Sequence, residues 1–202
     1  MYDCRPQGKR LRVNGGGRVL RNPGPSLRSY ADVVRDYQKR FRQGAADNLR
    51  FYANQTTLAD AVRLAALAQT AEGKRQPHQK HIPPAVLRDA YAKLKRCDFN
   101  ECQSFDDLYG MVDGAIRSIP GIGELAVYDT AHRIGAFLRL EPQRVYLHRG
   151  TRIGARAMGL GKGTNVLEVA DLPVTFRRLT AGDIENCLCI YKKDLQRVNE
   201  RQ

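Results

Sequence analysis

The sequence has no tryptophan, few other aromatic residues (7%) and little negative charge, with 21 Asp and Glu residues against 34 Lys and Arg residues. No apolar run approaches the roughly 20 residues that a membrane-spanning helix needs, so we expect no membrane association. The first six residues (MYDCRP) lack the apolar segment of a secretory signal. These absences and a hydrophobic fraction of 42% predict a folded cytoplasmic protein, associated with the nucleoid if the source is bacterial.

The sequence also lacks the signatures of a disulfide framework, of a metal site and of common catalytic motifs. Five cysteines, an odd number in 202 residues, do not indicate a disulfide framework. The spacings Cys97-x4-Cys102 and Cys187-x-Cys189 match neither a C-x2-C zinc pair nor the four-cysteine run of an iron–sulfur site. The phosphate-binding P-loop, H-E-x-x-H and G-x-S-x-G are absent. We therefore expect no metal and no cofactor.

The formal net charge of +13 is concentrated in two segments. Residues 1–28, rich in Gly and Pro, contain seven Lys and Arg residues and one Asp, which predicts a flexible basic arm. Residues 139–162 contain six Lys and Arg residues and one Glu. Clustered positive charge releases counterions when it meets phosphates, so nucleic acid is the expected partner. The alternatives are a solvated basic face, and an arm that docks on an acidic protein or folds back as an edge hairpin.

After the arm, apolar residues recur with helical spacing almost throughout. The first stripe comprises Tyr30, Val33, Val34, Tyr37 and Phe41, with Ser29 as its cap. Further helices are predicted from Thr57 to about Gly73, after Pro83-Pro84, after Ser104 with a capping box to Asp107, after residue 123, over 152–158, and after Thr180. Residues 166–169 and 174–176 are predicted as short strands or irregular chain. The sequence thus predicts one all-α domain over residues 29–202.

The most informative segment is Ile119-Pro120-Gly121-Ile122-Gly123-Glu124-Leu125, between two amphipathic helices. It resembles the helix-hairpin-helix motif, h-P-G-h-G, of proteins that bind and process DNA. The glycines permit a tight turn, and Ile122 is expected to anchor it between the helices. The amides from Gly121 to Leu125 would then face a phosphate at a helix N-terminus, a contact that carries no base sequence. The alternative is a turn that only joins two packed helices.

From Ser104 to Leu160 the chain resembles the core of the helix-hairpin-helix DNA glycosylases, a DNA-repair family whose hairpin is followed by V-D-T-H and a helix that closes in R-L-G-L. The corresponding segment here is Val145-Tyr146-Leu147-His148. The resemblance implies a catalytic Asp where this chain has His148 and, in bifunctional members, a Lys where it has Leu125. Without them, the amine nucleophile and the carboxylate that stabilises an oxocarbenium-like charge are missing. We therefore favour a binding protein over an enzyme.

A basic stripe is predicted after this segment. Arg149, Arg152 and Arg156 share one helical face and, with Lys162, are suited to a line of phosphates. A second basic group lies in the loop at 73–81, where two histidines among three Lys and Arg residues favour a phosphate contact over a metal site. These groups add to the predicted nucleic-acid surface.

If chemistry remains, the candidates for it are His148, Tyr146 and Asp129, because His148 follows the hairpin at the expected mouth of a cleft. The simpler interpretations are a histidine that hydrogen-bonds locally and an ordinary surface ion pair between Asp129 and Arg133. The prediction is sequence-independent binding of duplex or structured DNA, in preference to RNA. A divergent base-excision enzyme and an interaction subunit of a larger nucleoprotein assembly are the alternatives.

Overall fold

The structure, a computed structural model, describes residues 27–199; residues 1–26 and 200–202 are not described. The predicted basic arm therefore lies outside the described residues, except for Leu27 and Arg28. The described chain is mostly helical with one two-stranded sheet, which confirms the predicted all-α class. Among the helices of this part of the chain, none combines the length and the apolar content needed to cross a membrane.

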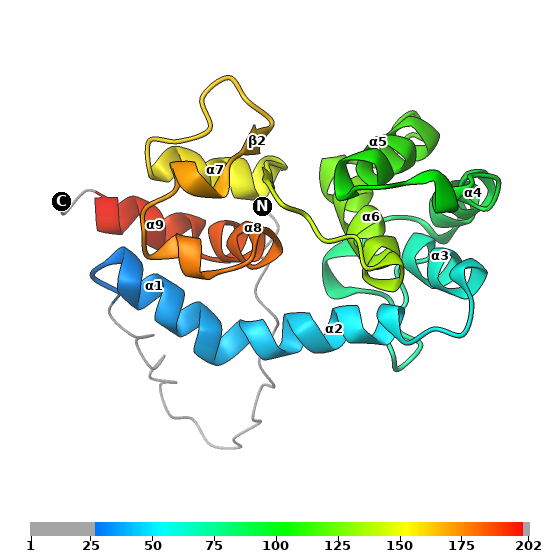
Figure 1. Cartoon of the computed structure of the whole chain (residues 1–202), viewed down its shortest axis with the longest axis horizontal. Helices are drawn as coiled ribbons and strands as arrows, with labels where there is room; N and C mark the ends of the chain where they lie inside the picture. Colours follow the sequence, from blue (N-terminus) through cyan, green and yellow to red (C-terminus); the bar gives the residue numbers. More distant parts are fainter. Residues whose placement is uncertain (1–26, 200–202) are drawn as a thin grey trace, which may run out of the picture.

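A long helical rod begins the described chain and runs beneath both halves of the molecule (Figure 1). It consists of α1 (Tyr30–Tyr37), the π-helical segment η1 (Gln38–Arg42) and α2 (Gln43–Ala53). Ser29 caps α1 in a capping box with Asp32. The apolar stripe predicts only the first part of this rod, because the α2 segment carries no comparable stripe.

One lobe is built on α2. It packs α3 (Leu58–Ala66), α4 (Pro84–Leu94), α5 (Phe105–Ile116) and α6 (Glu124–Leu138), with the 3-10 turns η2 (Pro77–Gln79) and η3 (Phe99–Glu101) in the connections. The predicted caps at Thr57 and Ser104 are both present, and Ser104 forms the predicted capping box with Asp107. The helix α3 ends before the predicted Gly73 because Ala68 has a left-handed φ of 52°.

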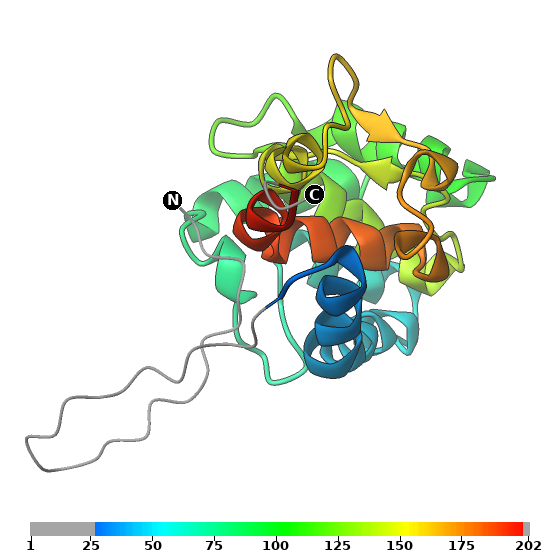
Figure 2. The same ribbon diagram turned by 90° about the vertical axis from the view of Figure 1, so that its left-hand side faces the viewer.

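The other lobe is built on α1 and the C-terminal third of the chain. It contains β1 (Val145–Tyr146), α7 (Arg149–Ala157), β2 (Val166–Leu167), the 3-10 turns η4 (Val169–Asp171) and η5 (Phe176–Arg178), α8 (Ala181–Ile190) and α9 (Lys192–Asn199). The two strands pair antiparallel, with Val145 opposite Leu167. Figure 2 shows α8 between α1 and α7, and both helices contact it. Of the two segments predicted as short strands or irregular chain, 166–169 contains β2, whereas 174–176 leads into η5 without pairing.

The buried side chains form two separate clusters, one per lobe. The α2–α6 lobe buries, among others, Tyr52, Leu108 and Ile134, and the other lobe buries Phe176 and Leu188. The rod and the link from α6 to β1 join the lobes (Figure 1). Helical periodicity predicts one domain over 29–202. It contains no signal for the division into two lobes, because a helix has the same kind of apolar face whether it packs in one core or the other.

Candidate nucleic-acid interface

The turn between α5 and α6 places two glycines and one isoleucine as the sequence predicts. Gly121 has a φ of 95°, a region that side chains with a Cβ rarely adopt. Ile122 is buried in the core of the α2–α6 lobe, and Gly123 is the N-cap of α6. A Cβ on Gly121 would meet Val86 of α4 at an ordinary 3.6 Å, so the backbone conformation and not crowding demands glycine there.

The start of α6 presents unused hydrogen-bond donors. The amides of Gly121, Gly123, Glu124 and Leu125 donate no hydrogen bond to any described residue, and Pro120 has no N–H. Both glycines are exposed. Four free amides at the positive end of a 15-residue helix form a site that attracts an anion.

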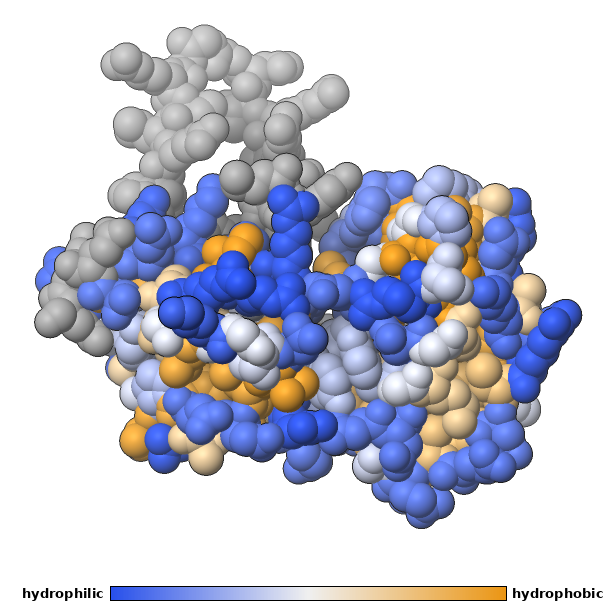
Figure 3. All heavy atoms as spheres, turned by 90° about the horizontal axis from the view of Figure 1, so that it is seen from above, coloured by the Kyte–Doolittle hydropathy of each residue, from blue (hydrophilic) through white to orange (hydrophobic). Residues whose placement is uncertain are grey.

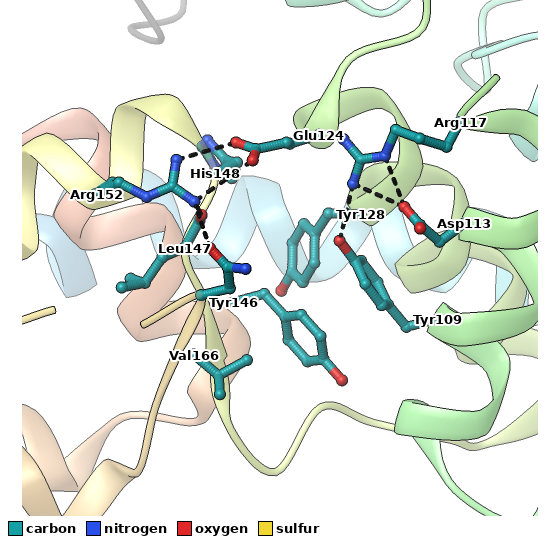
Figure 4. Close-up of a pocket in the computed structure, with 11 residues that line it drawn as sticks. Tyr109, Asp113, Arg117, Glu124, Tyr128, Tyr146, Leu147, His148, Arg152 and Val166 are labelled. Carbon is teal, nitrogen blue, oxygen red and sulfur yellow. Dashed lines mark hydrogen bonds and ion pairs between the residues drawn. The ribbon is translucent and has the colours of Figure 1, made fainter. Parts of the chain in front are cut away.

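A pocket of about 210 Å³ lies between the lobes beside this turn (Figure 4). Three tyrosines from three elements form its aromatic wall: Tyr109 of α5, Tyr128 of α6 and Tyr146 of β1. The rings of Tyr109 and Tyr146 have their centroids 4.4 Å apart, and those of Tyr128 and Tyr146 are 5.8 Å apart. Leu147, Val166, His148 and Asn165 complete the side next to α7. An aromatic wall of this kind suits a planar ring.

Two arginines flank the pocket, and each is paired with a carboxylate (Figure 4). Arg117 donates from Nε to Asp113 Oδ1 at 2.7 Å, and it also contacts the Tyr109 hydroxyl. Arg152 pairs with Glu124 at 3.1 Å, so α7 of one lobe is tied to the first residue of α6 in the other. The pocket therefore contains charged groups but no excess of either sign.

The Tyr128 hydroxyl is a buried polar group of the pocket that stays available to a ligand. Tyr128 is 2% exposed, lines the pocket, and makes no hydrogen bond to any described residue. Burial, with smaller contributions from Glu185 and Asp129, raises the pKa of its phenol well above the ordinary value. The group is thus a neutral hydroxyl that can donate or accept one hydrogen bond.

The predicted arginine stripe on α7 is only partly available. Arg149 and Arg156 are exposed and have no ion-pair partner among the described residues, and Lys162 is exposed in the loop that follows. Arg152 is engaged instead: besides Glu124 it donates to the Leu147 carbonyl and to Asn165 Oδ1. Figure 3 views the molecule from above, with α7 toward the viewer, and shows hydrophilic residues running across both lobes on this face.

His148 has a structural role in this structure. It is 3% exposed, and its Nδ1 accepts a hydrogen bond from the Gly150 amide, which caps α7. Its Nε2 therefore carries the proton and bonds to Glu185 of α8, beside Thr151. Because both ring nitrogens are engaged within the protein, the structure supports the local hydrogen-bonding interpretation of His148 and not the predicted acid–base role.

Tyr146 is also engaged, through its hydroxyl. That hydroxyl donates to Asp106, whose other oxygen pairs with Arg144. Burial, together with the hydrogen bond to Asp106, raises the pKa of Tyr146. The ring of Tyr146 thus belongs to the pocket wall, while its hydroxyl is hydrogen-bonded to Asp106.

Asp129 lies outside the pocket, in a buried network on the other side of α6. Its Oδ2 lies 2.6 Å from His78 Nε2 and 3.3 Å from an Arg133 nitrogen. Burial opposes ionisation, but His78 and Arg133 outweigh it and lower the pKa of Asp129 to about 2. The predicted ion pair of Asp129 with Arg133 is present, but it is buried and not at the surface, since Arg133 is 3% exposed and also donates to Gln79. His78 accordingly fixes its loop to α6.

A second pocket, of about 420 Å³, lies between α2, the end of α6 and the start of α8. Its lining mixes small apolar residues, four of them alanine, with charged and polar ones. His132 lines it, and the ring centroid of His132 lies 5.4 Å from that of Tyr128, which lines the aromatic pocket. Burial lowers the pKa of His132, so its imidazole is neutral. This pocket lies away from the free amides of α6 and from Arg149 and Arg156.

The described cysteines do not assemble a metal site. Cys97, Cys102, Cys187 and Cys189 form no disulfide with one another, and no three His, Cys, Asp or Glu residues of residues 27–199 are grouped to hold a metal ion. Cys187 is fully buried in the core, as its place in the apolar stripe predicts.

Several pocket residues are missing from the sequence prediction: Tyr109, Asp113, Arg117, Tyr128 and Asn165. One signal was present in the chain, since Tyr109, Asp113 and Arg117 follow one another at intervals of four and so share a face of one helix. The others come from separate elements, which only the fold brings together. No family model, curated protein or solved structure matches the chain, so the resemblance of residues 104–160 to the glycosylase core stays a prediction.

Proposed function

We propose that this protein binds nucleic acid without selecting a base sequence, and duplex or structured DNA in preference to RNA. The surface for it is the face that carries the α5–α6 turn and α7. The observation that carries the proposal is the set of four free amides at the start of α6, next to a helix with two unpaired arginines. Amides contact phosphate oxygens through the backbone, so this contact is independent of base identity.

The arginines extend this site along α7. Arg149 is the first residue of the helix, where the helix dipole opposes a cation and gives it no stabilisation. Arg156 lies two turns further on, so both guanidinium groups project from the same side of α7. A line of phosphates that starts at the α6 amides would meet both groups.

The test is a titration of a short mixed-sequence DNA duplex at several salt concentrations. We expect binding whose log–log salt dependence has a slope of about −0.9 per phosphate contacted. The variant Arg149→Ala/Arg156→Ala should bind much more weakly, with a slope reduced by about 1.8. The matched control is Arg35→Ala/Arg50→Ala, which removes two exposed arginines (75% and 62%) from the rod. A nearly flat salt dependence, or equal losses in both variants, would contradict the proposal.

The aromatic pocket favours a second function, a base-excision-type enzyme. A base extruded from the duplex would stack on the three tyrosines and meet the free hydroxyl of Tyr128. The three predicted catalytic residues each bond to other protein groups, and both pocket carboxylates are paired with arginine. Release of a base or strand cleavage on a duplex with a modified or abasic site, lost in Tyr128→Phe, would favour the enzyme over the binding protein.

A further inference from the structure

Glu124 lies where the proposed phosphate contact would form. It is the first residue of α6, among the amides that have no hydrogen-bond acceptor. Its two carboxylate oxygens face the two terminal nitrogens of Arg152, at 3.1 Å and 3.4 Å (Figure 4). A phosphate offers a guanidinium the same two-oxygen face that a carboxylate offers. Glu124 is therefore paired with the guanidinium of Arg152 and lies at the start of α6, and both of these groups would suit a phosphate.

Arg152 does not depend on Glu124 for its position. Its guanidinium also donates to the Leu147 carbonyl and to Asn165 Oδ1, the latter at 3.1 Å, and both acceptors belong to its own lobe. The Glu124 side chain is 41% exposed against 21% for Arg152, so the carboxylate is the partner that solvent reaches more easily. If Glu124 turned away, Arg152 would remain oriented toward the mouth of the pocket with its charge uncompensated.

We propose that Glu124 is an internal competitor for phosphate, which limits the affinity of this surface for nucleic acid until a backbone phosphate displaces it from Arg152. This inference rests on the proposed function. According to this inference, the Glu124 carboxylate lowers the affinity for nucleic acid, so its removal would strengthen binding. Its consequence is a lower affinity for any duplex segment that cannot bring a phosphate to Arg152.

The experiment compares duplex binding by the wild type, Glu124→Gln and Asp47→Asn. Asp47 forms an exposed pair with Arg50 at 2.8 Å on α2, so Asp47→Asn removes the same charge and also breaks an ion pair, but far from this surface. We expect Glu124→Gln to bind about tenfold more tightly, the gain from one charge-assisted contact. Its log–log salt slope should steepen, by up to about 0.9, since the charge of Arg152 is no longer offset by a neighbouring carboxylate. Asp47→Asn should stay within about twofold of the wild type.

A double variant identifies the group that is released. Arg152→Gln should weaken the binding of the wild type, and it should abolish the gain of Glu124→Gln when the two are combined. Glu124→Asp keeps the negative charge at the helix start but shortens its reach, and should give a smaller gain in the same direction if Glu124→Gln is poorly folded. Failure of the wild type to show salt-dependent binding would overturn the proposed function itself. Binding by the wild type with no gain in either Glu124 variant, or a gain equal to that of Asp47→Asn, would overturn this inference alone.

Discussion

Single buried polar residues hold distant segments of this chain together. Asp129 joins α6 to the 73–81 loop through His78, across 51 residues of sequence. His148 joins the start of α7 to α8 through Glu185, across 37 residues. Groups of this kind are costly to bury unless they are paired, and removal of one partner leaves the other charged or unbonded. At these positions polar chemistry specifies the fold.

The acid stability of the protein should depend on Asp129. Its folded pKa of about 2 lies below the ordinary value of 3.8, so ionised Asp129 stabilises the fold above pH 4 and this contribution is lost as the pH falls toward 2. The shift corresponds to about 2 kcal/mol. Denaturant unfolding measured from pH 2 to pH 7 should show Asp129→Asn to be less stable at neutral pH and to have a shallower decline in acid. An equal decline in both proteins would contradict the assignment.

Residues whose partners are close in sequence could be predicted, and those with distant partners could not. The cap at Ser104 follows from Asp107 three positions later, and the turn at Gly121 follows from a five-residue pattern. His148 shows the limit. Its neighbours in the sequence, Tyr146 and Arg149, indicate an exposed catalytic or phosphate-binding residue, whereas its partner Glu185 lies on a helix that no local pattern connects to it.

At the scale of elements, the rod links the lobes through a π-helical segment. In a π turn each amide bonds five residues back, so the turn holds one residue more than an α turn. The segment Gln38–Arg42 carries no buried residue, whereas α1 on one side and α2 on the other supply Tyr37 and Tyr52 to different cores. The extra residue therefore sets the rotation about the rod axis between the buried face of α1 and the buried face of α2.

Deletion of a residue should be tolerated in this segment and not next to it. Removing Lys39, which is exposed, converts the π turn into an α turn and leaves α1 and α2 close to their present register. Removing Gly44, an exposed residue of α2 with open space around it, would rotate everything after it by about 100° relative to α1. Thermal unfolding should show a small decrease in melting temperature for the Lys39 deletion and loss of the cooperative transition for the Gly44 deletion. Similar losses for both would refute this explanation of the π segment.

At the scale of the whole molecule, the two lobes differ in how the chain builds them. Apart from Tyr146, the α2–α6 lobe takes its core from one continuous stretch, residues 52–134. The other lobe takes its core from both ends of the described chain, with Val33, Val34 and Tyr37 from α1 and the remainder from residues 145–198. The α2–α6 lobe is thus an insertion into the other lobe. No periodicity in the sequence marks the borders of such an insertion.

Truncation should therefore damage the lobes unequally. A chain that ends at Tyr191 lacks Leu195 and Val198, both fully buried, and with them the contacts of α9 with α1 and α7. Hydrogen exchange should show lost protection in α1, α7 and α8 but retained protection in α3 to α6. Loss of protection throughout would mean that the lobes unfold as one cooperative unit.

The insertion also determines when each core can close during synthesis. The α2–α6 lobe has all but one of its buried residues once position 134 has left the ribosome, whereas α1, made earlier, must wait for α8 and α9 near the end of the chain. At roughly 5–20 residues per second this interval lasts several seconds. Throughout it the apolar face of α1 has no partner, so the nascent chain offers chaperones a binding site that the finished protein conceals.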